Sequence, residues 1–312
     1  MGADAHDLGL LGRELVVVTG KGGCGKSTVA AALAVAAAAR GIEVIVAEVD
    51  ARGDVARALG ATGAPEPSVE VELAPNLHHV SIDPDSALRH YLADQLPSRA
   101  LAETLLSSRV FPYFVAATPG MRELLTIGAV WDLTQEESRR TGERLYDLVI
   151  LDAPATGHGL AMLEAPSTFE RAAQAGRIAG QAGQIDALIR DPSRTAVVAA
   201  ARPEELPVNE TIDLAAELEE RLSVPLAAAV VDRVHGDPLT PEESRRVAQA
   251  GSDPAATGAA LAIHRRAEAE HLELKRLREA LACPVVTLPE IPSVDLGPGE
   301  VAGLATAMEE LL

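Results

Sequence analysis

The chain has 312 residues, 47% of them hydrophobic, so it can bury a large core and does not have the composition of a disordered segment. It carries 27 basic and 46 acidic residues, a net charge of −19, which disfavours nucleic acid and anionic membrane surfaces as partners. No apolar run is long enough to span a membrane, and Cys24 and Cys283 are too few for a disulfide framework, so we expect a cytoplasmic protein without direct membrane insertion.

Strand and helix signals alternate along the chain. Glu14–Thr19 is a short apolar run that predicts a buried strand, and Ser27–Arg40, rich in alanine and free of helix breakers, predicts a helix. Glu43–Val49 predicts a second strand, and a strand, a helix and a strand in this order form a βαβ unit with parallel strands. Further buried strands are predicted at 76–82, 146–151, 195–200, 226–231 and 284–288.

This alternation predicts an α/β fold with a doubly wound, mostly parallel sheet. Two intervals without a strand signal, approximately 84–142 and 165–191, have helical patterns, and a third helical stretch covers 255–282. We therefore expect a single domain over residues 1–312, with a helical subdomain inserted into it.

A glycine-rich segment follows the first predicted strand and opens the first predicted helix. Its sequence, GKGGCGKS, fits G-x-x-x-x-G-K-[ST], the phosphate-binding P-loop, although a glycine-rich turn without a ligand is the alternative. Backbone N–H groups of such a loop surround phosphate oxygens, and the helix N-terminus adds partial positive charge. Lys26 is expected to reach the β- and γ-phosphates, and the Ser27 hydroxyl to bind Mg²⁺. The expected nucleotide-contacting residues are Gly20, Lys21, Gly22, Gly23, Cys24, Gly25, Lys26, Ser27 and Thr28.

Lysine is scarce in this chain. Lys21, Lys26 and Lys275 are its three lysines, and two of them lie in the glycine-rich segment. A lysine directly after the first glycine resembles the deviant Walker A form of dimeric ATPases. That resemblance implies that Lys21 reaches the nucleotide of a partner subunit, and an exposed loop lysine is the alternative.

Two aspartates follow predicted strands. Asp50 and Asp152 lie at the edge where open α/β sheets bind ligands, and Leu148–Asp152 has the apolar-run-then-Asp form of a Walker B strand. A simple helix cap or turn is the alternative interpretation for both aspartates.

The segment 152–158, D-A-P-A-T-G-H, resembles the switch II motif D-T-A-P-T-G-H of the ArsA-type ATPases. That family includes the arsenite-pump ATPase and the ATPase that targets tail-anchored membrane proteins. Residues 49–54 stand at the place of its switch I. Shorter matches lie at 119–123, 202–205, 230–233 and 288–292. The likeness covers nearly the whole chain, which resembles a bacterial single-half member.

The resemblance implies an Mg²⁺-dependent ATPase that converts ATP and water to ADP and phosphate. It implies that Asp50 positions or activates the attacking water, with Lys26 and Lys21 as the other catalytic residues. Ser27 would bind Mg²⁺ directly and Asp152 through a water molecule. The implied switch residues are Asp50, Asp54, Thr156, Gly157 and His158, and the implied base-contacting residues are Asp232 and Pro289.

Two departures from the family pattern leave alternatives open. Switch I has Ala51 and Arg52 where the family has Pro-Ala, and Asp232 stands where many relatives have an adenine-reading Asn. We expect a dimeric switch, homomeric or formed with a paralogous ATPase, that couples nucleotide state to a helical surface for a protein or membrane-protein client. The alternative is a nucleotide-binding regulatory or scaffold subunit with little turnover, paired with a paralogous ATPase.

Overall fold

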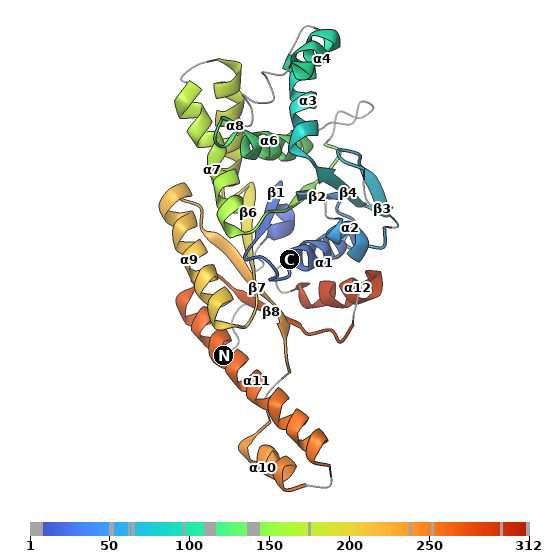
Figure 1. Ribbon diagram of the computed structural model, residues 1–312, viewed down its shortest axis with the longest axis vertical. Coiled ribbons are helices and arrows are strands. Elements are labelled where there is room, and N and C mark those ends of the chain that lie inside the picture. Colours follow the sequence, from blue (N-terminus) through green and yellow to red (C-terminus); the bar gives the residue numbers. More distant parts are fainter. Residues whose placement is uncertain are drawn as a thin grey trace.

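The fold is α/β and contains one eight-stranded sheet, in the order β3-β4-β2-β5-β1-β6-β7-β8 (Figure 1). The structure is a computed structural model that describes residues 9–49, 53–61, 63, 66–95, 98–108, 117–135, 144–173, 176–236, 239–250, 253–293 and 296–309. Its neighbouring strands are parallel, apart from the antiparallel pair β3–β4. The predicted doubly wound, mostly parallel sheet is confirmed.

The strands occupy the predicted places with one exception. They are β1 (Leu15–Thr19), β2 (Val44–Val49), β3 (Val71–Ala74), β4 (Leu77–Ile82), β5 (Leu148–Asp152), β6 (Thr195–Ala201), β7 (Leu226–Val234) and β8 (Val285–Pro289). The sequence analysis missed β3. This edge strand is short and mostly exposed, so it has no continuous apolar run.

Helices cover both faces of the sheet because successive strand residues point to opposite sides. Leu15 and Val17 of β1 enter one core, and Val16 and Val18 enter the other. The second core is covered by α1 (Lys26–Ala38), α2 (Asp54–Ala58) and α12 (Pro298–Ala307). The first is covered by α6 (Met121–Gln135), α7 (Thr156–Ala173), α8 (Arg177–Arg190), α9 (Glu205–Leu222) and α11 (Pro254–Ala280).

Both strand-free intervals are helical where they are described. The first holds α3 (Pro84–Gln95), α4 (Arg99–Ser107) and α6, and the second holds the end of α7 and α8. Figure 1 shows these helices gathered at one end of the molecule. Ile127 of α6 and Leu163 of α7 belong to the same core as the sheet, and we propose on this ground that the helical region is part of one domain with it.

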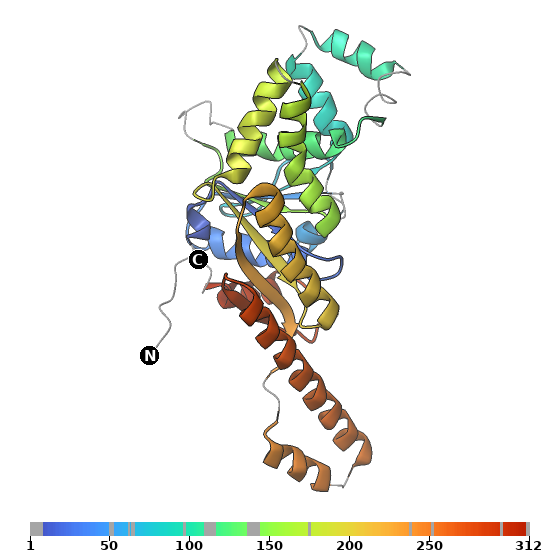
Figure 2. The ribbon, with the colours of Figure 1, turned by 90° about the vertical axis from the view of Figure 1, so that its left-hand side faces the viewer.

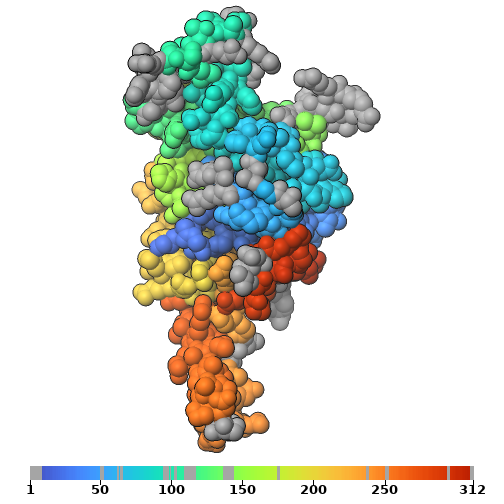
Figure 3. Space-filling view, turned by 45° about the vertical axis from the view of Figure 1, so that its right-hand side comes forward, coloured from blue at the N-terminus to red at the C-terminus, as the bar shows by residue number. Residues whose placement is uncertain are grey.

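A pair of helices, α10 (Pro241–Ala250) and the first half of α11, extends from the opposite end (Figures 2 and 3). The buried residues of α11 all lie in its second half, namely Ala267, Glu270, Leu274 and Leu277. A short 3₁₀ turn, η1 (Leu10–Gly12), precedes β1. None of the described helices is long and apolar enough to cross a membrane.

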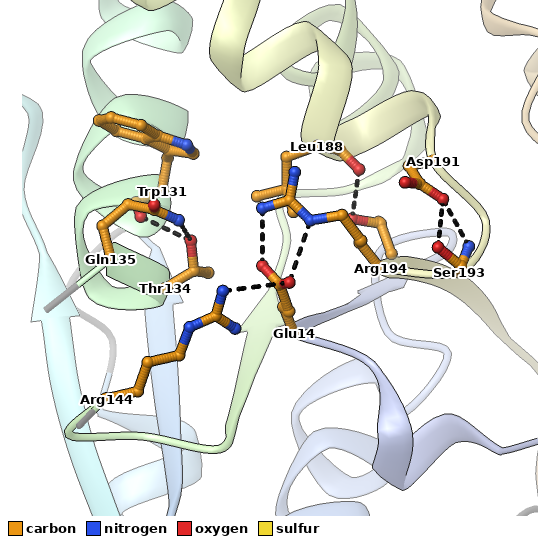
Figure 4. Close-up of polar contacts among 10 residues, drawn as sticks. Glu14, Trp131, Thr134, Gln135, Arg144, Leu188, Asp191, Ser193 and Arg194 are labelled. Atoms are coloured by element: carbon orange, nitrogen blue, oxygen red, sulfur yellow. Dashed lines mark hydrogen bonds and ion pairs between the residues drawn. The ribbon is translucent and has the colours of Figure 1, made fainter. Parts of the chain in front are cut away.

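An ionic cluster joins the segments that lead into three central strands (Figure 4). Arg194, before β6, donates two hydrogen bonds to the Glu14 carboxylate at 2.8 and 3.0 Å, and Arg144, before β5, pairs with it at 3.1 Å. Burial alone would raise the pKa of Glu14, but the hydrogen bonds from Arg194 and Arg144 outweigh burial and hold this pKa below its ordinary value.

Glu14→Gln is expected to lower the free energy of unfolding by about 1 kcal/mol at pH 7, a small loss because both arginines are partly exposed to solvent. Since the folded-state pKa is depressed, this contribution is present above pH 4.5 and is lost as the pH falls through the folded-state value. Urea titrations of both proteins at pH 7 and near pH 3 measure it. A difference of equal size at both pH values would contradict the assignment.

Candidate nucleotide-binding site

The glycine-rich loop joins β1 to α1 and packs tightly on the neighbouring strands. Gly20 has φ +148°, and a Cβ there would lie 2.2 Å from the Ala200 carbonyl oxygen of β6. Gly25 has φ +85°, and a Cβ there would lie 2.3 Å from Asp232 Oδ2 of β7. The loop therefore needs glycine at both positions, for its backbone conformation and for its close approach to the sheet.

The N-terminus of α1 offers backbone donors and positive charge. Gly25 caps the helix without a side-chain hydrogen bond, and the first turn contains no acidic residue. Lys26 Nζ donates to the Lys21 carbonyl oxygen at 3.2 Å, so this lysine folds back over the loop. Cys24 is buried, and burial raises the pKa of its thiol, so it acts as a small neutral side chain. This arrangement suits a phosphate group.

Ser27 and Asp152 are brought together from positions 125 residues apart. Ser27 Oγ donates a hydrogen bond to Asp152 Oδ2 at 2.6 Å. Asp152 is 6% exposed, and burial raises its pKa to about 6 although the Ser27 hydrogen bond opposes this. Its other oxygen, Oδ1, is buried and has no hydrogen-bond partner among the described residues. The pair therefore offers the hydroxyl and carboxylate oxygens, one of them unpaired, that suit Mg²⁺ and its bound water.

The segment at 156–158 begins α7 beside the loop. The Thr156 N–H donates to the Gly20 carbonyl oxygen at 3.1 Å, so the start of α7 is tied directly to the loop. Gly157 and His158 are exposed on the first turn. Further along, α7 contains Pro166. The predicted switch II residues thus lie next to the predicted phosphate site.

Of the predicted switch I residues, Asp50 lies outside the described residues, together with Ala51 and Arg52. Asp54 begins α2, and its N–H donates to the Glu48 carboxylate at 2.7 Å. Glu48 is buried and lies 3.0 Å from His79 Nε2. Burial would raise the pKa of Glu48, but the His79 and Asp54 hydrogen bonds outweigh it and lower this pKa.

The buried Glu48 thus anchors Asp54, at the downstream end of the predicted switch I segment, and the sequence analysis missed this contact. The available signal was a glutamate inside an otherwise apolar strand.

Lys21 is paired within its own chain. Its Nζ lies 2.6 Å from Glu210 Oε1 of α9, and each side chain is one-third exposed. The sequence analysis missed Glu210, which has no local signal because it is one of many acidic residues on α9. Lys21 is thus held, partly exposed, at the surface of the loop.

The two predicted base-contacting residues lie at the ends of neighbouring strands. Asp232 is near the end of β7, and Pro289 ends β8 opposite Val234. Asp232 is 4% exposed, lies against Gly25, and has a pKa raised by burial. Pro289 is exposed. Asp232 therefore borders the loop, and Pro289, at the end of the neighbouring strand, faces solvent.

A loop of this form between a buried strand and a helix, with a serine and a strand-end aspartate beside it, defines a P-loop nucleotide-binding protein. The family model described as anion-transporting ATPase matches residues 13–182, more than half of the chain. The chain belongs to this family, the ArsA-type ATPases, and the resemblance seen in the sequence is confirmed.

Three relatives show how far the similarity extends. ATPase BagA of Mycobacterium tuberculosis is 28% identical over 248 residues, which are 78% of this chain and 72% of that protein. The arsenical pump-driving ATPase of Escherichia coli is 28% identical over 208 residues, 66% of this chain and 32% of the pump protein. A Halobacterium salinarum protein described as an arsenical pump-driving ATPase is 28% identical over 225 residues, 69% and 34% of the two chains. The match thus covers about one third of each pump-driving ATPase.

Proposed function

We propose that this chain binds Mg²⁺ and ATP at residues 20–28, hydrolyses the γ-phosphate bond, and works as a dimer whose closure depends on nucleotide. The observation that carries the proposal is the Ser27–Asp152 hydrogen bond beside a glycine loop that carries Lys26, with the buried Asp152 Oδ1 unpaired among the residues that the structure describes. Family membership supports ATP hydrolysis in general.

Each residue has a distinct part in this proposal. Because the Ser27 hydroxyl donates its hydrogen bond to Asp152, the lone pairs of Oγ would be available to a cation. The loop N–H groups and Lys26 hold the β- and γ-phosphates and stabilise the charge of the transition state. Mg²⁺, when bound, would neutralise charge on the phosphate oxygens. Asp50 would orient the attacking water. In phosphoryl transfer of this kind, the protein contributes mainly by positioning the reactants and by stabilising charge.

The exposed ion pair of Lys21 supports the dimer part of this proposal. An ion pair as exposed as Lys21–Glu210 contributes about 1 kcal/mol or less, so it costs little to break. A triphosphate carries several negative charges, and we propose that the partner's nucleotide replaces Glu210 as the group that Lys21 contacts. The partner is a second copy or a paralogous ATPase. Closure would move the helical region at α3–α8, which we propose as the client-binding part.

Lys21→Ala tests this proposal, with Lys275→Ala as the matched control because Lys275 is exposed on α11. With Mg²⁺ and a non-hydrolysable ATP analogue, we expect the wild type and the control to form dimers and Lys21→Ala to stay monomeric. Its ATP turnover is expected to fall by about 10³-fold, as for a charged group supplied in trans. Light scattering and phosphate release measure both.

Glu210→Gln is expected to favour dimer formation with the ATP analogue, because Lys21 then has no ion pair to break before it contacts the partner's nucleotide. A Lys21→Ala protein that dimerises and turns over normally would contradict the dimer proposal. Tight analogue binding without wild-type turnover would instead support the regulatory or scaffold subunit.

A further inference from the structure

A cavity separate from the nucleotide loop lies in the helical region. Its volume is about 630 Å³, and it opens to solvent between α3, α6, α8, the end of β4 and residues 68–70, within the region that Figure 1 shows at the upper end. Its walls are mostly apolar, with Leu88, Leu125 and Ala182 as examples from the three helices. Among the described residues that line it, none belongs to the segments 20–28 or 152–158.

The volume of the cavity can be compared with that needed by a small molecule and by a transmembrane helix. Small-molecule sites typically measure about 300–1,000 Å³, and this cavity falls within that range. A membrane-spanning helix of about 20 residues, about 30 Å long and about 10 Å across, needs more than about 2,000 Å³. Folded interiors contain few voids larger than one water molecule, which takes about 30 Å³. The cavity is therefore larger than an ordinary packing defect and has the size of a small-molecule site, whereas a whole transmembrane helix would extend well beyond it.

The polar groups of the cavity define the head group of a ligand. Gln181 of α8 lines it, and its Oε1 is buried without a hydrogen-bond donor anywhere in the part of the chain that the structure describes. The described lining residues include Glu70 and Asp132 but no lysine or arginine. His90 is the one basic side chain among the described lining residues, so a ligand carboxylate or phosphate would meet no permanent cation there, and its burial beside Glu70 and Asp132 is costly. An uncharged hydrogen-bond donor would satisfy Gln181.

A glycine keeps the cavity open. Gly128 lies in the middle of α6 and lines the cavity, and a Cβ there would meet only Ile185 Cδ1, at 3.9 Å. Glycine weakens a helix, and here no close contact requires it. A larger side chain at 128 would point into the empty volume.

We propose that this cavity binds an uncharged, largely apolar small molecule that carries a hydrogen-bond donor, with Gln181 Oε1 as the acceptor. The ligand enters within one subunit, at a site that the nucleotide does not touch. The binding step involves no covalent chemistry, and it does not depend on ATP hydrolysis.

1-Decanol is the probe, and decanoate, which has the same chain length and an anionic head, is its matched control. Trp131 is the only tryptophan of the chain and lines the cavity, so its fluorescence reports occupancy. We expect a saturable fluorescence change with one decanol per chain and a rise in the thermal midpoint of the nucleotide-free protein. Decanoate is expected to bind at least about tenfold more weakly.

Two variants locate the site. Gly128→Leu is expected to abolish the decanol response while nucleotide binding is unchanged. Gln181→Leu keeps the cavity apolar and is expected to weaken decanol binding by about tenfold, through loss of the acceptor. Gln181→Leu also tests the site if Gly128→Leu fails to fold.

Equal affinity for decanol and decanoate would overturn the proposed ligand class. Undiminished binding to folded Gly128→Leu, or no saturable binding up to the aqueous solubility of decanol, would overturn the site. Because every readout uses the full chain without nucleotide, these outcomes are independent of the ATPase proposal.

Discussion

Lys26→Ala is expected to weaken ATP binding by at least about 100-fold, because it removes a charge-assisted hydrogen bond to the phosphates that contributes about 3 kcal/mol. The other lysine of the loop is not expected to compensate for it, because Lys21 in the proposed function contacts the partner's nucleotide and pairs with Glu210 in the free chain. The net charge of −19 makes this local positive charge more important for a polyanionic ligand. Calorimetry or a fluorescent nucleotide measures the change.

Lys275→Ala is the control for this experiment as well, since it removes the same charge from an exposed position on α11. Its ATP affinity should equal that of the wild type. A Lys26→Ala protein with wild-type affinity would remove the glycine loop from the proposed site, whatever the behaviour of Lys21.

Asp152→Asn is expected to reduce ATP turnover by about 100-fold or more, while it stabilises the nucleotide-free protein. Asn has the same shape but no charge to hold a cation-bound water. The stability effect follows from the pKa of Asp152, which burial raises from 3.8 to about 6. Folding therefore opposes ionisation, and the stability present below pH 3.8 is lost as the pH rises to about 6.

Above pH 6 the raised pKa of Asp152 lowers the free energy of unfolding by about 3 kcal/mol. The Asn variant recovers only part of this, because its hydrogen bond with Ser27 is weaker. Urea titrations at pH 4 and pH 7.5 should show a variant that is stabilised mainly at the higher pH. Asp213→Asn, on the exposed face of α9, should change neither stability nor turnover. A destabilised Asp152→Asn protein at pH 7.5 would show that the carboxylate serves to hold the fold rather than a ligand.

The central sheet could be predicted because its strands are short apolar runs buried on both faces. The segments at 146–151 and 226–231 carry this signal clearly, and the structure places β5 and β7 there. β3 could not be predicted, since it gains its place by pairing with β4 and keeps most side chains exposed. The bounds of α1 shifted by one or two residues because helix ends depend on caps and local turns.

The phosphate loop could be recognised because its residues are contiguous, and Asp152 because parallel strands end at one edge. The sequence analysis did not identify three further residues, Glu48, Glu210 and Gln181. Each owes its role to packing between elements that are distant in the chain: Glu48 meets His79 on β4, Glu210 meets Lys21, and Gln181 meets a void bounded by three helices. Residue type and spacing do not identify the partners in such contacts, although Glu48 stands out as a charged residue within an apolar strand.

Pro166 lies inside α7 and separates the helix into two halves that can bend relative to each other. A proline inside a helix has no N–H for the carbonyl four residues earlier, here Met162, and its ring crowds that carbonyl, so bending stiffness is lowest at this point. The first half of α7 begins at Thr156 on the loop, and the second half carries Phe169, which packs with Leu124 and Ala182. A displacement of the loop would thus be taken up as a change in the bend angle of α7 at Pro166, rather than as a shift of the whole helix along its axis.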